Sequence, residues 1–416
     1  YSVDQGLPNN TVNCTLKDRD GFIWFGTWYG LCCFDGVKFK TFNKQEHDSD
    51  VPPRKIQRIV EDKNGYIWVK TIDRKLYVFN KVTECFHAVY DDMKNYSENI
   101  QVIKLQNTAE GDVLLLTKDK NLLLAGVDEK GQVTIKILFD SRDEINKHDY
   151  TLKHHVLCET EEYISWIGTD YKVSAVHKGA ELASRPADFI TSKINSGDKD
   201  SFTSFFEDGR KVWVGDRAGI FYSIDVRTGL VNRYVLSEIK GAISNLLVTP
   251  AGYVYLSVAG QGTYEYDLAE RRLQKINTEM NDAMVTHAFI DQYDKIWFHE
   301  NEKALIYYDP LNHTAKRFPF TMFGKITTLY SEDAGERGLF FLSPAGEAWL
   351  FDREHVEMVY INKLKQLSND RANQQFYHLM LDNDGVLWLS SADEGVYCMN
   401  FPKKQFNLLS LSPQSA

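Results

Sequence analysis

Several aromatic, acidic and amide side chains fall at short polar breaks between apolar runs, where a ligand could reach them. Trp28 and Tyr29 are the most suggestive pair, because they stand together between two apolar stretches. Sugar rings stack on flat apolar faces, and carboxylates and amides hydrogen bond to sugar hydroxyls. Burial of the two aromatic rings against a neighbouring loop or domain is the alternative explanation. The candidate ligand-binding residues are Trp28, Tyr29, Asp73, Arg74, Asp170, Tyr171, Asp216, Arg217, Gln261 and Glu300.

The sequence contains no recognisable catalytic or metal-binding pattern. Asp18-Arg19-Asp20-Gly21 resembles the start of a calcium loop, but the further oxygen ligands and the closing Glu of an EF-hand are missing. A glycosidase needs two carboxylates that converge on one sugar bond, and no spacing here pairs two of them. His287 and His378 fall at comparable places in two units, where packing or solvent exposure explains them better than a ligand role. We therefore expect no catalytic residue, no cofactor and no metal.

The elements that would position these side chains come from an internal repeat. Val12 to Thr27 comprises a short alternating strand, an acidic and glycine turn, and a second strand that carries Trp24. Two further short strands follow, and the same order recurs along the chain. The key large apolar position of each copy lies 42 to 52 residues after the one before it. These nine positions are Trp24, Trp68, Leu114, Trp166, Trp213, Tyr255, Trp297, Phe341 and Trp388.

This period and the strand pattern predict a β-propeller. Four short strands every 40 to 50 residues is the propeller signature, and no sustained helical spacing of apolar residues competes with it. Gly21 and Gly65 stand where a positive φ is needed between the first two strands, and the preceding Asp suits the same turn. The second-strand aromatic is expected to fill the gap to a neighbouring blade. Tyr1 to Val3 is expected to pair as an outer strand of the last blade.

The number of blades per ring stays open at this point. The fold class is all-β, with about nine four-stranded blades in residues 1–416. Either they form one large ring, or a seven-bladed ring ends near residue 320 and a second array begins there.

Composition restricts the partners of the chain. It has 48 Lys and Arg against 58 Asp and Glu, for a formal net charge of −10, which argues against binding nucleic acid or an anionic membrane, although a local basic patch is possible. No apolar run reaches the length of a transmembrane helix, so we expect any export signal or membrane anchor to lie outside this chain. The six cysteines show no disulfide or zinc spacing and are expected to be free buried thiols, although Cys14 could meet Cys32 or Cys33.

Two motifs near the N-terminus point to a known repeat. Gly6-Leu7-Pro8-Asn9-Asn10-Thr11-Val12 is followed by Asp20-Gly21-Phe22-Ile23-Trp24-Phe25-Gly26-Thr27. Together with Gly30-Leu31 and Phe34-Asp35, they resemble the two-component regulator propeller repeat. That repeat fills the periplasmic sensor regions of hybrid two-component systems in Bacteroides-type gut bacteria.

The resemblance implies a function. It implies a non-catalytic ectodomain in the periplasm that recognises glycan-derived oligosaccharides and signals across the inner membrane to regulate polysaccharide utilisation genes. Kinase and membrane segments would lie outside this chain, the full-length receptor would be a homodimer, and this region would contact no nucleic acid. A propeller polysaccharide lyase or glycosidase, and a protein-interaction scaffold, are the alternatives.

Overall fold

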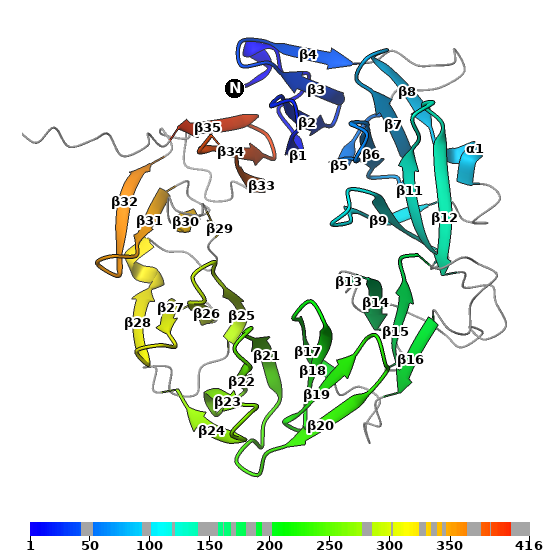
Figure 1. The fold of residues 1–416 in the computed structure, drawn as a ribbon. Helices are drawn as coiled ribbons and strands as arrows, with labels where there is room; N and C mark the ends of the chain where they lie inside the picture. The colour runs from blue at the N-terminus through cyan, green and yellow to red at the C-terminus, as the bar shows by residue number, and fades with distance from the viewer. Residues whose placement is uncertain are drawn as a thin grey trace, which may run out of the picture. The chain divides into compact units, whose positions relative to one another are not determined.

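The structure is a computed structural model of the chain. It describes residues 1–42, 53–93, 101–118, 121–139, 157–160, 162–167, 172–179, 189–193, 202–276, 285–300, 303–323, 330–333, 339–342, 347–363, 376–382 and 384–400. Within this part of the chain the strands form nine antiparallel sheets, eight with four strands and one with three, each in simple sequence order (Figure 1). Each predicted repeat unit corresponds to one sheet, which confirms the β-propeller fold.

The chain divides into two compact units. The first consists of Tyr1–Trp28, Cys32–Thr41 and Leu329–Ala416, and the second of Tyr29–Leu31 and Phe42–Thr328. The first unit therefore carries most of sheet one together with sheets eight and nine, and the second carries sheets two to seven. The predicted division near residue 320 and the number of blades per ring stay predictions.

The strands of sheets one, eight and nine are β1 (Val12–Lys17), β2 (Ile23–Thr27), β3 (Gly30–Phe34), β4 (Phe39–Phe42), β29 (Tyr330–Asp333), β30 (Leu339–Leu342), β31 (Glu347–Asp352), β32 (Glu357–Lys363), β33 (Phe376–Leu381), β34 (Val386–Ser391) and β35 (Val396–Asn400). Those of sheets two to four are β5 (Ile56–Glu61), β6 (Ile67–Thr71), β7 (Leu76–Asn80), β8 (Cys85–Ala88), β9 (Val102–Asn107), β10 (Val113–Thr117), β11 (Leu122–Val127), β12 (Val133–Phe139), β13 (Leu157–Glu159), β14 (Tyr163–Ile167), β15 (Lys172–His177) and β16 (Phe189–Lys193). Those of sheets five to seven are β17 (Phe202–Glu207), β18 (Lys211–Asp216), β19 (Ile220–Asp225), β20 (Val231–Val235), β21 (Ile243–Val248), β22 (Tyr253–Val258), β23 (Gly262–Asp267), β24 (Arg272–Lys275), β25 (Val285–Ile290), β26 (Ile296–Glu300), β27 (Ala304–Asp309) and β28 (Thr314–Pro319). The short helices are η1 (Val3–Gln5), α1 (Tyr90–Met93) and η3 (Phe320–Phe323).

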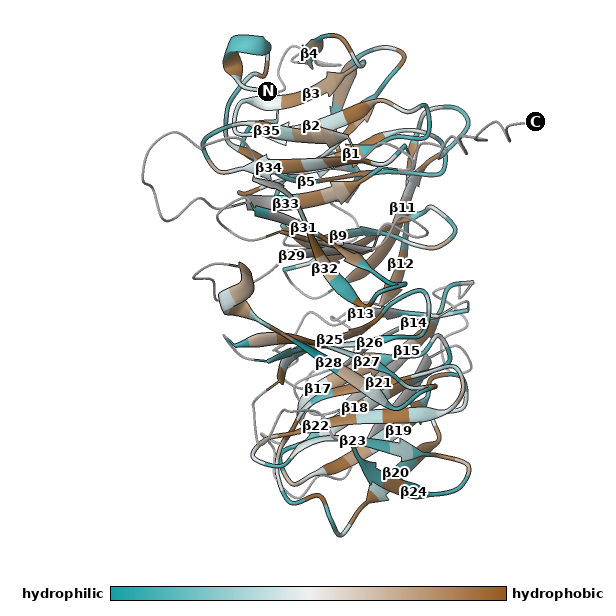
Figure 2. Ribbon diagram, turned by 90° about the vertical axis from the view of Figure 1, so that its left-hand side faces the viewer, coloured by the Kyte–Doolittle hydropathy of each residue, from teal (hydrophilic) through white to brown (hydrophobic). Residues whose placement is uncertain are grey.

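In several described sheets the large second-strand side chain fills the space to a neighbouring sheet, as predicted. Trp68 is fully buried and shares a hydrophobic cluster with Val113 and Leu115 of the next sheet. Trp213 packs in the same way with Val254 and Leu256. Each sheet is therefore stabilised mainly by the cover that its neighbour provides. Figure 2 shows the consequence, with hydrophobic residues along the strands and hydrophilic residues at many turns.

The first and last sheets pack together within the first unit (Figure 1). Trp388 of β34 shares a cluster with Val12 and Phe25 of the first sheet. Tyr1 donates from its terminal nitrogen to the Val396 carbonyl at 2.6 Å and accepts from the Val396 N–H at 2.8 Å. The predicted outer strand at Tyr1 to Val3 is thus confirmed at Tyr1 only, because η1 begins at Val3.

The described cysteines and helices bear on two further expectations. Cys14, Cys32, Cys33, Cys85 and Cys398 form no disulfide bond, so the considered pairing of Cys14 with Cys32 or Cys33 is absent. Cys14, Cys32 and Cys33 are buried as expected, whereas Cys85 is half-buried and Cys398 is exposed. The side chain of Cys158 lies outside the described residues. In the part of the chain that is described, no helix is both long and apolar enough to cross a membrane.

Candidate functional site

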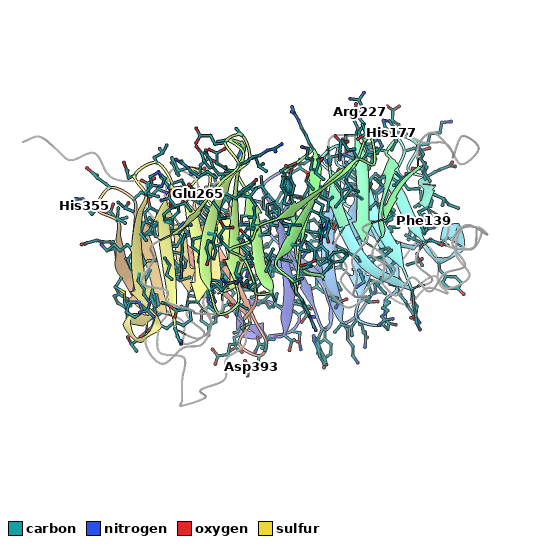
Figure 3. All side chains as sticks on the ribbon, turned by 90° about the horizontal axis from the view of Figure 1, so that it is seen from below. Phe139, His177, Arg227, Glu265, His355 and Asp393 are labelled. Atoms are coloured by element: carbon teal, nitrogen blue, oxygen red, sulfur yellow. The ribbon has the colours of Figure 1, made fainter. Side chains whose placement is uncertain are left out.

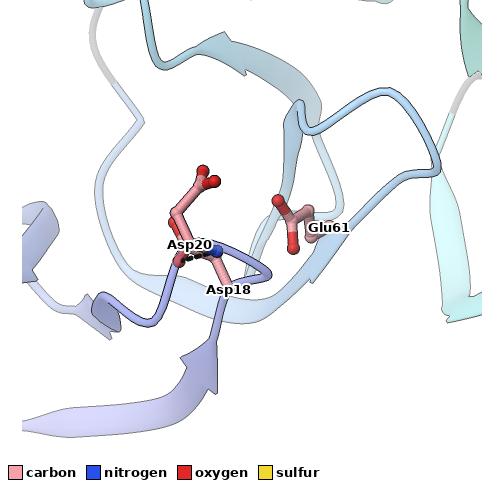
Figure 4. Close-up of side chains that lie close together, drawn as sticks. All are labelled: Asp18, Asp20 and Glu61. Atoms are coloured by element: carbon pink, nitrogen blue, oxygen red, sulfur yellow. Dashed lines mark hydrogen bonds between the residues drawn. The ribbon is translucent and has the colours of Figure 1, made fainter.

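The acidic residues of the first-to-second-strand turns serve the fold. One oxygen of Asp18 accepts from the Asp20 N–H at 3.0 Å (Figure 4) and from the Phe22 N–H at 2.9 Å. The other oxygen accepts from the Trp24 indole at 2.8 Å. One carboxylate therefore closes the turn and satisfies the buried indole N–H. The same arrangement recurs at Asp62 with Trp68, Asp208 with Trp213, Asp291 with Trp297, and Asp382 with Trp388.

The third-to-fourth-strand turns use carboxylates and amides in a similar way. Asp128, for example, accepts from the N–H groups of Lys130 and Gln132 at 2.9 and 2.8 Å. Both kinds of turn lie at the same edge of a sheet, because consecutive strands are antiparallel. We call this end of the strands the turn edge. The opposite end, which carries the connection from the second to the third strand, is the tip edge. In the first unit Figure 3 shows His355, from a turn edge, and Asp393, from a tip edge, on opposite sides.

The described candidate ligand residues lie at tip edges, and two of their carboxylates have structural roles. Asp216 is only 2% exposed, and it accepts from the N–H groups of Ala218 and Ile220 at 2.9 and 2.8 Å. Burial raises its pKa above the ordinary value for Asp. Glu300 is 4% exposed and forms an ion pair with Arg317 at 2.9 Å. Both side chains are turned into the fold rather than toward solvent.

Gln261 also makes structural contacts. Its side chain accepts from the Lys240 N–H at 2.6 Å and donates to the Glu238 carbonyl at 3.0 Å. It therefore ties the tip of sheet six to the connection that leads into that sheet.

The remaining candidates are accessible. Trp28 and Tyr29 are 41% and 61% exposed, and Arg217 is exposed as well. Asp73 is exposed and lies 3.5 Å from the Lys75 ammonium group. Arg74 stands in the left-handed region at φ 68°. Asp170 and Tyr171 lie outside the described residues.

Arg74 points to a neighbour that the sequence did not single out. Its guanidinium reaches the Gln101 side chain at 3.5 Å, and its positive charge acts on the buried Lys70 of β6. Every residue of β6 is buried, including Lys70. The sequence signal for this residue is a Lys directly after the apolar run Ile67-Trp68-Val69. Such a Lys indicates a special role, because Lys is almost never buried without a partner.

The repeated four-stranded sheets define this chain as a β-propeller protein. Residues 6–29 match the family described as "Two component regulator propeller", so the chain carries that repeat at its N-terminus and the resemblance is confirmed.

Among curated proteins, the chain is similar to "Histidine kinase P4" of Formosa agariphila, with 33% identity over 84 residues. That stretch covers 18% of this chain and 6% of the relative.

Among solved structures, the chain is similar to two extracellular domains described as parts of hybrid two component systems from B. thetaiotaomicron. One shares 14% identity at a TM-score of 0.41, covering 96% of this chain and 66% of that one. The other shares 15% identity at a TM-score of 0.36, covering 97% and 59%. The chain thus spans less than two thirds of these domains. The Dos1 propeller has a TM-score of 0.49 and 14% identity, covering 80% of this chain and 90% of that one.

Proposed function

We propose that this chain is a non-catalytic ligand-sensing ectodomain of a hybrid two-component system, located in the periplasm. The observation that carries the proposal is the two component regulator propeller repeat at residues 6–29. The use of Asp residues as turn caps in five of the sheets supports the non-catalytic part, because these carboxylates accept hydrogen bonds from backbone N–H groups and indoles.

The ligand in this proposal is an oligosaccharide derived from a glycan. Trp28 and Tyr29 support it, because exposed aromatic rings at a tip edge offer the flat surfaces on which sugar rings stack. In the full-length receptor, which we propose to be a membrane-anchored homodimer, ligand binding would favour one of two arrangements. Signalling to the kinase requires only that the ligand binds these arrangements with different affinity. The output would be the regulation of polysaccharide utilisation genes.

Calorimetric titration of the chain against a panel of glycan oligosaccharides tests this function. We expect heat of binding with at least one class and no released product after prolonged incubation. Trp28→Ala should weaken the binding. Phe22→Ala is the matched control, because Phe22 is 42% exposed in the same sheet but lies at the turn edge. Release of shortened sugars would support the lyase or glycosidase alternative. If no oligosaccharide of the panel gives heat of binding and a protein partner copurifies with the chain, the scaffold alternative is supported.

A further inference from the structure

Lys70 is a buried cation without a counter-charge. The residue is 6% exposed, and its ammonium group donates to the Gln57 side-chain oxygen at 2.5 Å. Among the described residues, no carboxylate forms an ion pair with it. Desolvation by burial lowers its pKa, and the charges of Arg74 and Arg58 lower it further. A buried charge is costly unless a partner of opposite sign compensates it.

The positive charge of Arg58 makes the burial of the Lys70 ammonium group still less favourable. It stands directly opposite Lys70 in the antiparallel pairing of β5 with β6. Like charges at directly opposite positions destabilise a sheet. Arg58 is exposed and, within the described part of the chain, has no ion-pair partner of its own. With Arg74 on the adjoining tip, these residues form what we call the basic cluster (Arg58, Lys70 and Arg74).

The repeat supplies an internal comparison for this position. Each of several sheets has a bulge at the start of its first strand, and the residue after the bulge pairs with the second strand near the tip edge. In sheets five and six the corresponding pairs are Ser204 with Gly215 and Asn245 with Ser257, which are uncharged. Asn245 uses its amide to donate to the Val285 carbonyl of the next sheet at 2.7 Å. Blade packing at this position therefore requires no charge, and the two cations of sheet two need another explanation.

We infer that the basic cluster is a subsite for an anionic substituent, a carboxylate or a sulfate group, on the oligosaccharide ligand. This inference rests on the proposed function and narrows the ligand to acidic glycans. An Arg guanidinium binds carboxylate or sulfate oxygens through paired N–H donors, and a Lys ammonium adds a point charge. Such a group would supply the counter-charge that Lys70 and Arg58 lack. It also reconciles a local cationic site with a chain whose formal net charge is −10.

The test compares three probes of equal length on the wild-type chain by calorimetry. They are a neutral galacto-oligosaccharide, an oligogalacturonate and a sulfated galacto-oligosaccharide. We expect one acidic probe to bind at least about tenfold more tightly than the neutral one, and this preference to shrink as salt is raised. Which acidic probe prevails identifies the carboxylate or the sulfate as the natural group.

Two variants locate the effect. Lys70→Met keeps the apolar stem and removes the charge, so we expect it to abolish the preference for the acidic probe. Lys275→Met is the matched control, because Lys275 is exposed on the outer strand of sheet six. Melting temperatures provide a readout independent of sugars. Inorganic sulfate should raise the melting temperature of the wild-type chain more than that of Lys70→Met, and unliganded Lys70→Met should be at least as stable as the wild type.

The outcomes separate this inference from the function on which it rests. Equal binding of neutral and acidic probes, with equal stabilisation of both chains by sulfate, would overturn the anionic subsite and leave the sensor function intact. No sugar binding, with sulfate stabilisation that Lys70→Met abolishes, would support the anion site and overturn the oligosaccharide ligand.

Discussion

The pairing of a turn carboxylate with a buried indole makes a strong prediction about stability. Asp62 is 1% exposed and accepts hydrogen bonds from the N–H groups of Asn64 and Tyr66 and from the indole of Trp68 at 2.9 Å. Trp68 is fully buried. Replacing Asp62 by Ala would therefore remove the turn cap and leave an indole N–H without a partner away from water.

The two losses differ in size. The two turn hydrogen bonds are only partly buried, so water can replace the carboxylate there and that part should cost about 1 kcal/mol. The orphaned buried indole N–H should add about 1–3 kcal/mol. Asp128 is the matched control, because it caps an equivalent turn through Lys130 and Gln132 but bonds no indole. Asp62→Ala should therefore lower the free energy of unfolding by about 2 kcal/mol more than Asp128→Ala.

Urea unfolding followed by circular dichroism measures this difference. Trp68→Phe, alone and combined with Asp62→Ala, completes a double-mutant cycle in which the cavity left by the smaller ring cancels. We expect a coupling energy between Asp62 and Trp68 above about 1 kcal/mol. Equal losses for Asp62→Ala and Asp128→Ala, or a coupling energy near zero, would refute the idea that the carboxylate stabilises the fold through the indole.

Two further predictions concern pH and chain closure. Burial, and the facing His287, lower the pKa of His299 below its ordinary 6.5, so protonation favours the unfolded state and stability should fall as pH drops below about 6.5. Melting temperatures measured from about pH 7.5 to 5 should show this slope weakened in His299→Asn, and an unchanged slope would contradict the assignment. Gly395→Ala should destabilise the chain more than the about 1–2 kcal/mol expected for Gly36→Ala, because both residues have a positive φ but only a Cβ at 395 would collide with the Tyr1 carbonyl. Equal melting temperatures of the two variants would show that Tyr1 is not held against β35.

Much of the fold could be predicted from the sequence because its determinants are local. The Asp, Gly and Trp of one turn lie within a few residues of each other, so Asp18 and Trp24 meet whenever the hairpin forms. The apolar second strands could also be predicted, because the repeat places a similar sheet on each side to cover them.

The candidate site was less predictable, because the position of a residue at a tip does not determine whether its side chain points to solvent or into the fold. Trp28, Tyr29 and Arg74 are exposed, whereas Asp216 and Glu300 are buried by backbone donors and by an arginine that lies 17 residues further along the chain. A tip residue serves a ligand or the fold depending on which groups approach it, and those groups come from other strands.

The sequence by itself determined the repeat, the nine sheets and the turns that close them. Only the tertiary structure decided that Arg58 stands opposite Lys70. A bulge between Ile56 and Arg58 shifts the register of β5 by one residue, so that Arg58 rather than Gln57 takes the paired position. A one-residue shift moves side chains to the other face of a strand. The bulge that causes this shift could not be predicted from the sequence. The charge pattern on which the anionic subsite rests thus arises from pairing between strands.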